Sequence, residues 1–528
     1  MKRKTYLKIL LGIVTLVLLV KLLTTIFVEP WSRKKILTTL NEKNRDYLID
    51  IGKVHISLIK RGIELESIIL SSKQNHKDGR DLKGKIASVK FRGINIAKAL
   101  FKKDIDINEV TISNSRITGK IQSPEKASPP IVLPLNIRIR RILFSEIDLS
   151  VGDISTAESY LVKEGALKLY NLKVEKQDTL SPGIVKQFDF EAKELVSVSS
   201  DSMYSYTARG IDYSAASNTL AIDSFSIHPN YKDNDFTSRY KFQTNRFEAG
   251  FRNIYVKDFS ASIYFATRSI ISSYVEIGKM DMKVFRDKRK EFRHVNRPSF
   301  QDMIYNYKGT IRIDSVGLKN GDIIFTVHDQ EANEPGSISF NKIHAKIYKI
   351  TNETIYKTES AYLELKCNTL VMGKGALTIL LKSRIFDRNN TFSLDGTLTD
   401  LEAKELNPIL EKNAFIYAAS GKIDAMNFSF TANNAKATGK MILLYHGLDI
   451  AIKNKKTDDT TAFRERFISS IVNIKVLNSN PLPGKEVRVG IIDFERDPER
   501  FLFHYCFRSI LSGIKSSLVK SPKKRKNK

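Results

Sequence analysis

The sequence is poor in the residues and motifs that mark disulfide-bonded, metal-binding and catalytic proteins. Cys367 and Cys506 are its two cysteines, which excludes a disulfide framework and cysteine-rich zinc sites and leaves a single bridge open. Its eight histidines are scattered, without His-Glu-x-x-His or His-x-His spacing. A Gly-x-Ser-x-Gly motif and a phosphate-binding loop are missing, since Gly373 to Gly375 is too short and is typical of a hairpin turn. We therefore predict a non-enzyme with no catalytic residue, no metal and no cofactor.

Linkers between domains are missing as well. No Gly/Ser-rich or low-complexity segment divides the 528 residues, which favours one extended array over a series of separate domains. Hydrophobic residues make up 42% and charged residues 27% of the chain, as in folded proteins. The net charge of +28 suits an anionic partner, either nucleic acid or phospholipid headgroups. Because the cations are dispersed along the chain, we predict no nucleic-acid partner.

One long apolar run is present, from Ile9 to Val28. Lys21 is its single charged residue, and a helix of these twenty residues is about 30 Å long, enough to cross a bilayer. The residues after Val20 lack the small-x-small site of signal peptidase, which favours a retained anchor over a cleaved signal peptide. The short basic leader, residues 1–8, favours a cytoplasmic N-terminus and an exported body. We therefore predict a single-pass membrane anchor from Ile9 to Val28.

The stretch from Ile105 to Ile117 has an apolar pattern that recurs along most of the chain. Its apolar residues stand at offsets 0, 2, 5 and 7 from Ile105, so the second pair is one residue out of phase with the first. A β-bulge would correct the phase and keep both pairs on one face of a single long strand. A hairpin would need a turn sequence such as Asn-Gly, and the break here is Asn108-Glu109. The pattern therefore predicts a bulged strand.

Copies of this pattern predict a repeating array of strands, each with one dry and one wet face. An antiparallel sandwich would give the same alternation and stays open as the alternative. The copies begin at Ile63, Ile105, Ile137, Leu167, Leu220, Ile254, Val275, Ile311 and Ile338.

Two amphipathic helices and a basic run are predicted beside the strands. Ser32 to Tyr47 has helical spacing and would cover the open edge of the first strands. A second helix begins at Asp497 and Pro498, and its apolar face either caps the core or contacts a membrane or partner. The basic run from Arg286 to Arg297 is either a solvated loop or a contact with headgroups. The apolar face of the second helix consists of Phe503, Phe507, Ile510, Ile514 and Leu518.

Several short motifs, taken in order, resemble the AsmA-like family. They are Ile94 to Phe101 (INIAKALF) before the strand at Ile105, Glu405 to Ile409 (ELNPI), Gly421 to Phe430 (GKIDAMNFSF) and Gly439 to Leu444 (GKMILL). The resemblance implies a single-pass inner-membrane protein of a double-membraned bacterium, with its bulk in the periplasm. It also implies a β-groove related to the chorein-type bridge-like lipid-transfer proteins, in which an apolar concave face carries acyl chains.

The predicted fold is mainly β. An N-terminal transmembrane helix leads into an elongated, twisted antiparallel β-sheet groove with a few short helices, and a C-terminal amphipathic helix follows. The predicted segments are a cytoplasmic leader (1–8), the anchor (9–28), an AsmA-like cap with the first strands (29–122), a central β-groove array (123–400), a C-terminal AsmA-like β segment (401–495), the amphipathic helix (496–519) and a basic tail (520–528).

We expect such a protein to bind lipids, phospholipids above all, and to conduct them between inner and outer membranes or support outer-membrane biogenesis. Its predicted partners are acyl lipid, the membrane, and inner- or outer-membrane proteins, with Phe503, Phe507, Ile510 and Ile514 as candidate contacts to membrane or partner. The alternative is a non-catalytic envelope scaffold that acts on outer-membrane clients through strand edges. The candidate lining of the groove is Ile105, Ile107, Val110, Ile112, Ile137, Ile139, Ile142, Phe144, Ile311, Ile313, Val316 and Leu318.

Overall fold

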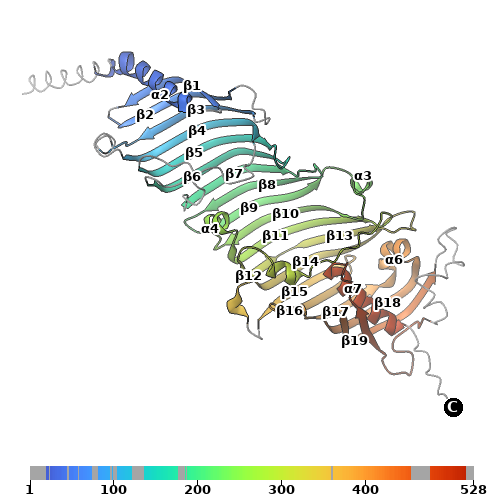
Figure 1. Ribbon diagram of the computed structural model, residues 1–528. Helices are drawn as coiled ribbons and strands as arrows, with labels where there is room; N and C mark the ends of the chain where they lie inside the picture. Colours follow the sequence, from blue (N-terminus) through green and yellow to red (C-terminus); the bar gives the residue numbers. More distant parts are fainter. Residues whose placement is uncertain are drawn as a thin grey trace, which may run out of the picture. The chain divides into compact units, whose positions relative to one another are not determined.

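The computed structural model confirms a mainly β protein, with 60% strand and 17% helix. The described residues fall into two compact units, unit 1 within residues 1–223 and 260–266, and unit 2 within 224–259 and 267–528. In each unit the strands lie side by side, largely in chain order (Figure 1). The described residues are 20–22, 24–43, 47–57, 59–73, 81–95, 98, 104–121, 136–175, 185, 187–357, 361–452 and 476–518.

Unit 1 is a sheet in which each strand pairs with the next along the chain. The pairs are antiparallel except β4 with β5, which is parallel. The entirely antiparallel sheet that the pattern predicts is therefore wrong at this pair, because side-chain alternation does not record strand direction. The strands are β1 (Tyr47–Ser57), β2 (Gly62–Ser72), β3 (Asp81–Arg92), β4 (Ile105–Ile121), β5 (Ile137–Asp153), β6 (Ser159–Val174), β7 (Gln187–Val198) and β8 (Tyr204–Ser214), and β9 (Thr219–Pro229) is shared between the units.

Unit 2 contains a second array of strands and most of the helices. Both β12 and β13 pair in parallel with β11, one with each half of it, and the other strand pairs from β10 to β20 are antiparallel. The strands are β10 (Asn245–Lys257), β11 (Ile270–Asp287), β12 (Ile311–Leu318), β13 (Gly321–His328), β14 (Gly336–Thr351), β15 (Tyr362–Val371), β16 (Gly375–Arg384), β17 (Phe392–Glu402), β18 (Ile416–Ala432), β19 (Lys436–Ile452) and β20 (Val489–Glu495).

The helices are short apart from one near each end of the described chain. The predicted copy at Ile254 does not form one strand, because β10 ends at Lys257 and a helix begins at Ala261. The helices are η1 (Thr24–Val28), α2 (Glu29–Lys43), α3 (Asp233–Ser238), α4 (Ala261–Thr267), α5 (Phe300–Tyr305), η4 (Thr354–Tyr356), η5 (Ala403–Leu406), α6 (Asn407–Asn413) and α7 (Leu502–Leu518).

Apart from the copy at Ile254, the copies of the repeat lie in single strands, as predicted. In the copy at Ile338 the register of β14 against β15 shifts by one residue between Asn341 and His344, as the predicted bulge requires. In β4 the phase correction is different. β4 runs through the break at Asn108 without a turn. Its register with β5 is the same on both sides, since Ile107 faces Ile139 and Glu109 faces Arg141. No extra residue is therefore inserted in β4 relative to β5. The two strands change phase together, which keeps their apolar residues in step.

Left-handed residues make several of these shared phase changes. A residue with positive φ rotates the following side chains relative to the preceding ones, at a cost that Asn and Gly keep low. Because the neighbouring strand changes phase at the residue opposite or beside it, the pairing register of the two strands is the same before and after the change. The matched positions are Ser67 (φ 55°) opposite Gly52, Asn114 (φ 52°) beside Glu146 (φ 55°), and Asn253 (φ 53°) opposite Gly278.

The predicted membrane anchor is not supported, and the single-pass inner-membrane localisation that depended on it is wrong. Among the described residues, no helix is long and apolar enough to cross a membrane. Ile9 to Leu19 of the predicted anchor lie outside the described residues, as do the leader (1–8) and the basic tail (520–528). The last residues of the run, to Val28, form the short turn η1, which continues into the charged helix α2.

Helix α2 covers the free edge of β1, as predicted, although it begins at Glu29 rather than Ser32 and ends at Lys43. The Asn41 side-chain amide exchanges two hydrogen bonds of 2.8 Å with the backbone of Ile49. The carboxylate of Glu29 accepts from the N–H of Ile56 at 3.0 Å. These side chains occupy backbone groups that an added strand would otherwise use.

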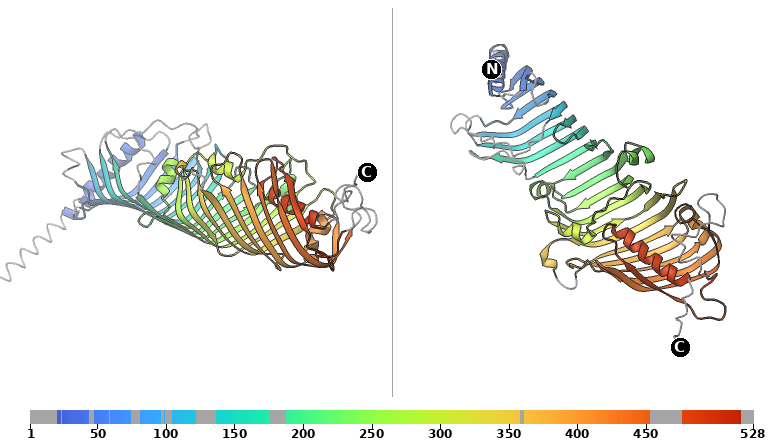
Figure 2. Two further views of the ribbon diagram at one scale, coloured as in Figure 1. Left: turned by 90° about the horizontal axis from the view of Figure 1, so that it is seen from below. Right: turned by 45° about the vertical axis from the view of Figure 1, so that its right-hand side comes forward.

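Helix α7 covers the edge of β20 in a similar way, beginning at Leu502 rather than at Asp497. The hydroxyl of Ser516 accepts from the Ile491 N–H at 2.9 Å, and that of Ser512 accepts from the Asp493 N–H at 3.2 Å. In the right-hand view of Figure 2 the helix, in red, lies against the strands drawn in orange. The first and last strands of the described chain are thus both closed by helix side chains.

Gly490→Ala is expected to loosen α7, because the helix lies close against β20 at this residue. A Cβ at Gly490 would overlap Ser517 Oγ and lie 2.5 Å from the Gly513 carbonyl oxygen. Overpacking of this kind costs about 1–3 kcal/mol, and hydrogen exchange of α7 should rise accordingly. Gly250→Ala in β10 is the matched control, since no atom lies within 4 Å of the position that its new methyl group would take. Equal exchange in the two variants would contradict the close packing of α7 on β20.

Candidate functional site

The apolar residues of the repeat align across unit 1 as continuous rows. Residues opposite each other in neighbouring strands point to the same side of a sheet. We call the two longest rows A and B, and together with the other apolar pairs of the repeat they form the apolar face of unit 1. Row A is Ile56, Ile63, Phe91, Val110, Ile142, Leu169 and Phe188, and row B is Val54, Leu65, Val89, Ile112, Phe144, Leu167, Phe190 and Tyr213.

The eight predicted lining residues of unit 1 are brought together on this face. Each residue from β4 lies beside one from β5. Ile107 and Val110 are the most buried of the eight, at 7% and 5% exposure, and the others are partly buried. The pairs are Ile105 with Ile137, Ile107 with Ile139, Val110 with Ile142, and Ile112 with Phe144.

Helices cover the two ends of the apolar face of unit 1. At β1, Ile36 and Leu37 of α2 pack on the cluster around Ile51. At β8, the Phe265 ring of α4 lies 6.3 Å from the Phe188 ring. Each described strand is hydrogen-bonded to its neighbours in the sheet, so the described residues provide no second sheet over this face, as a sandwich would require.

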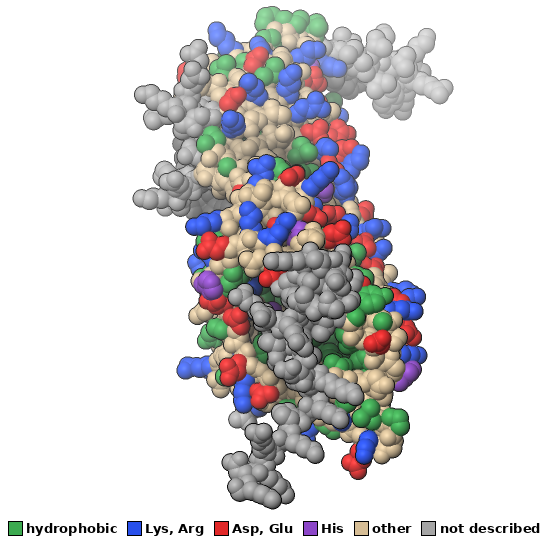
Figure 3. Space-filling model, turned by 90° about the vertical axis from the view of Figure 1, so that its right-hand side faces the viewer, with side chains coloured by type: hydrophobic (Ala, Val, Ile, Leu, Met, Phe, Trp, Pro, Cys, Tyr) green, Lys and Arg blue, Asp and Glu red, His purple; other side chains and the backbone are tan. Residues whose placement is uncertain are grey.

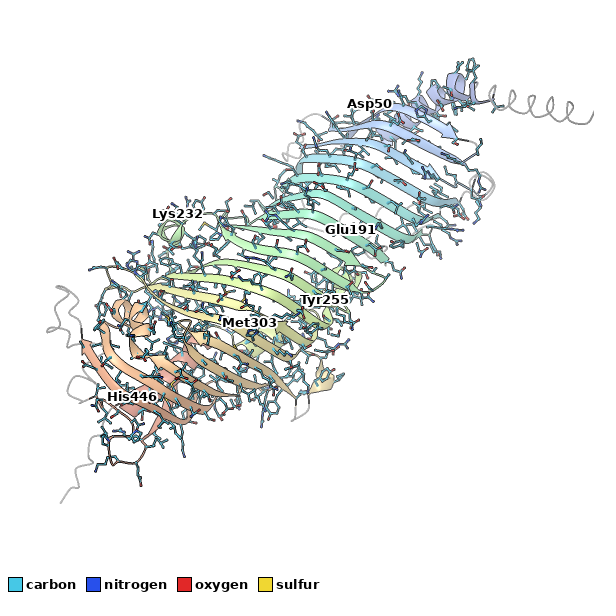
Figure 4. The ribbon with its side chains drawn as sticks, turned by 180° about the vertical axis from the view of Figure 1, so that it is seen from behind. Asp50, Glu191, Lys232, Tyr255, Met303 and His446 are labelled. Carbon is cyan, nitrogen blue, oxygen red and sulfur yellow. The ribbon has the colours of Figure 1, made fainter. Side chains whose placement is uncertain are left out.

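The opposite face of unit 1 is polar and carries ion pairs between neighbouring strands. Glu194 accepts from Lys163 at 2.6 Å and from Arg209 at 2.8 Å, and these two cations lower the pKa of its carboxyl group. Glu191 pairs with Lys168 at 3.0 Å, and Figure 4 labels Glu191 among the side chains of this face. In the view of Figure 3, which does not face this side of unit 1, basic and acidic side chains are likewise interspersed on the surface. The sheet is therefore wet on one side and apolar on the other.

Unit 2 has rows of the same kind, which we call C and D and which form the apolar face of unit 2. Val316 and Leu318, two of the predicted lining residues, belong to rows C and D. The other two, Ile311 and Ile313, lie earlier in β12 beside Ile270 and Ser272. Row C is Val256, Val275, Val316, Ile347, Leu365, Leu381, Leu394 and Phe430, and row D is Ile254, Ile277, Leu318, Ala345, Cys367, Ile379, Gly396, Phe428 and Met441.

Helix α7 buries the β17 to β20 end of this face. The sequence left open whether the apolar side of this helix caps the core or contacts a membrane or partner, and the structure answers this for some of its residues. Ile510 and Ile514 pack on the hydrophobic core around Met441 and Ile492, so they cap the core. Two residues of the predicted face differ from them. Phe503 and Phe507 are 58% and 41% exposed, with their rings stacked 6.3 Å apart. Phe503 also lies 6.3 Å from the Phe325 ring of β13.

Much of the basic run from Arg286 to Arg297 is paired. Arg289 contacts Asp287 at 2.9 Å, and Lys288 contacts Asp329 at 3.2 Å. Further on, the backbone N–H of Arg297 donates to the carbonyl of Pro498 at 2.8 Å. The run is therefore not a freely solvated loop along its whole length, because it packs against the segment that leads into α7.

Sequence reasoning missed the aromatic cluster at the β7 and β8 end of the apolar face. The rings of Phe188 and Tyr213 lie 5.1 Å apart, and the Tyr213 hydroxyl accepts from the Ala261 N–H at 3.0 Å. The alternation of Phe188 and Phe190 in β7 was a usable signal. The contact with α4 was not predictable, because the helix lies nearly fifty residues further along the chain.

The two cysteines are free thiols. Burial raises the pKa of the Cys506 thiol to about 12 and also raises that of Cys367, which makes both poor nucleophiles. Among the described residues there is no cluster of three or more His, Cys, Asp or Glu side chains able to hold a metal ion. Apolar area and its alignment are thus the main features of the candidate site.

Comparison of the sequence with protein-family models and with curated proteins finds no match in either. The functional conclusion therefore depends on the residues and geometry of this chain.

Proposed function

We propose that this protein binds acyl lipids along the apolar faces of its units and lets them move along the rows. The observation that carries the proposal is the alignment of rows A and B, which continue over seven and eight strands without a charged residue. Partly exposed apolar surface of this extent is typical of an interaction site. The ordered motifs that resemble AsmA-like proteins support the same proposal.

The dimensions of the rows suit an acyl chain. Neighbouring strands lie about 4.8 Å apart, so a row over eight strands is about 34 Å long. One leaflet of a bilayer core, which an acyl chain spans, is about 15 Å thick. A chain can therefore lie across several strands of unit 1. Burying its methylene groups would contribute about 0.8 kcal/mol each, and the opposite, ion-paired face would stay in water.

The alternative, an envelope scaffold that recruits clients by strand addition, has less support. Strand addition needs free backbone groups at a sheet edge. At the edge of β1 these groups bind Asn41 and Glu29, and at the edge of β20 they bind Ser512 and Ser516. A client would first have to displace α2 or α7.

Photocrosslinking at Phe190 tests the proposal. Phe190 lies in row B and Glu191 follows it on the polar face. With benzoylphenylalanine in place of Phe190 in the full chain, we expect irradiation in cells to give phospholipid adducts that mass spectrometry identifies. The same substitution at Glu191 should give few or none, because its side chain points to water. Adducts to protein alone at both positions would favour the scaffold and contradict lipid binding.

A further inference from the structure

The apolar side of β11 ends at Arg286, a partly buried arginine that has no acidic partner among the described residues. Arg286 follows Met282 and Val284 on the same side of β11, and it lies beside the buried Val327 of β13. Its Nη2 donates to Gln243 at 3.3 Å, whereas its Nε is buried without a hydrogen-bond partner. A buried donor left unpaired is costly, and a buried cation is more so.

The charges that surround Arg286 are positive. Burial lowers the pKa of its guanidinium, and the positive charges of Arg500 and Arg297 lower it further. The Arg297 side chain lies over the Phe501 ring at 5.2 Å, and that of Arg500 over the Phe292 ring at 3.6 Å. Three arginines therefore share one region at the beginning of α7.

His504 lies in the same region as the three arginines and, like Arg286, has a buried nitrogen without a hydrogen-bond partner. This nitrogen is Nδ1. Burial lowers the pKa of its imidazole to about 4, with further contributions from Arg500 and Arg508. The imidazole is therefore neutral at neutral pH, and it can donate one hydrogen bond to an anion.

Two carboxylates lie near this cluster of three arginines and His504, and one of them pairs with a member of it. Asp497 lies 3.5 Å from Arg500, whereas Glu499 lies 3.0 Å from His294, outside the cluster. Neither is among the charges that act on Arg286. The protein thus gathers more positive than negative charge here, an arrangement that is unfavourable in the free protein and favourable once an anion binds.

An exposed apolar surface adjoins these cations. Phe503 precedes His504 in α7 and is 58% exposed, and its ring lies 6.3 Å from Phe325, which is opposite Val284 in the sheet. A ligand that is anionic at one end and apolar at the other would contact both parts. Guanidinium groups favour phosphate, because their fork of donors matches its oxygens.

We propose that a phosphate group binds at this cluster and that it belongs to the headgroup of a lipid whose acyl chains lie on the apolar face of unit 2. The inference rests on the proposed function and adds the residues that would hold the phosphate of the headgroup. The phosphate would take the donors that the free protein leaves unpaired. The cluster consists of Arg286 and His504, each with a buried nitrogen that lacks a hydrogen-bond partner, and of Arg297 and Arg500, whose side chains lie over the Phe501 and Phe292 rings.

Calorimetric titration of the full chain with three probes tests the inference. Dihexanoyl phosphatidic acid carries the phosphate, dihexanoylglycerol carries the same chains without it, and inorganic phosphate carries no chains. We expect phosphatidic acid to bind more tightly than dihexanoylglycerol, by about 10-fold or more, because charge-assisted hydrogen bonds to a partly buried cation are strong. Arg286→Gln should remove this difference and leave the affinity for dihexanoylglycerol unchanged.

A control variant and a stability measurement separate binding from folding. Arg252→Gln also removes one arginine, from the polar face of β10, and should bind all probes as the wild type does. Without ligand, Arg286→Gln should unfold at a temperature no lower than the wild type, because it removes a partly buried charge that has no acidic partner among the described residues. Arg297→Gln, which alters a more peripheral member of the cluster, should weaken phosphatidic acid binding in the same direction.

The outcomes distinguish the inference from the proposed function. Equal affinity of the wild type for the two lipids would overturn the phosphate site and leave lipid binding standing. Failure of both lipids to bind would contradict the proposed function itself. If inorganic phosphate bound as tightly as phosphatidic acid, the cluster would be a site for free phosphate, and its assignment to a lipid headgroup would be overturned.

Discussion

Replacing Ile492 by aspartate is expected to unfold the C-terminal part of unit 2. Ile492 is 0% exposed and packs between β19 and α7, where Met441 and Tyr505 belong to the same core. The substitution removes a buried side chain worth about 1.5–3 kcal/mol and places a carboxylate where water does not reach. We expect the free energy of unfolding to fall by more than about 4 kcal/mol. This is a large part of the total for a typical domain, which is about 5–15 kcal/mol. Urea denaturation and limited proteolysis of α7 measure it.

Ile491→Asp is the matched control for this substitution. Ile491 is the preceding residue of β20, points to the other face and is 53% exposed. Its backbone bond to Ser516 does not involve the side chain, so the change should cost about 0.5 kcal/mol or less. Similar losses in the two variants would mean that α7 does not bury this face of β20 in solution.

The regular part of the fold was predictable from the sequence because side-chain alternation depends on local geometry. Apolar residues at offsets 0, 2, 5 and 7 indicated β4, β5 and β6 and the face on which they gather. The pattern also required a change of phase, and Asn108-Glu109 correctly excluded a turn at that point. The pattern could not show that β5 changes phase beside β4, since this depends on which strands become neighbours.

Strand direction and helix packing could not be predicted from the sequence, because they too depend on which elements become neighbours. The parallel pairing of β4 with β5 and of β11 with β12 leaves the alternation of side chains unchanged. Helical spacing identified the apolar residues of α7, yet it did not distinguish Ile510, which packs on the core, from Phe503, which stays exposed. That difference arises from the position of β20 relative to the helix.

The candidate site also has a part that was predictable from the sequence and a part that was not. The twelve predicted lining residues came from a repeated pattern, and the structure places eight of them in contact across β4 and β5. Arg286 came from no pattern, because a cation within a basic run resembles a solvated charge. Its significance depends on burial and on Arg500, which lies more than two hundred residues away in the sequence.

Phe144→Glu is expected to weaken lipid binding by unit 1 about 10–100-fold. Phe144 lies near the middle of row B, between Ile112 and Leu167, so a carboxylate there would interrupt the apolar surface on both sides. The loss combines the apolar contact of a phenyl ring, about 1.5–3 kcal/mol, with the cost of desolvating a charge against an acyl chain. Each 1.4 kcal/mol corresponds to about 10-fold in affinity. Fluorescence polarisation of a labelled fatty acid measures the change.

Leu143→Glu makes the same kind of change on the opposite face of β5. Leu143 lies between Thr111 and Lys168, where a carboxylate meets water and a neighbouring cation, so affinity should stay within about 2-fold of the wild type. Circular dichroism would show that both variants keep their strands. Equal weakening by the two substitutions would point to a general loss of structure. Equal retention of affinity would mean that the acyl chain does not lie on row B, because a charge there cannot coexist with a bound hydrocarbon without a measurable cost.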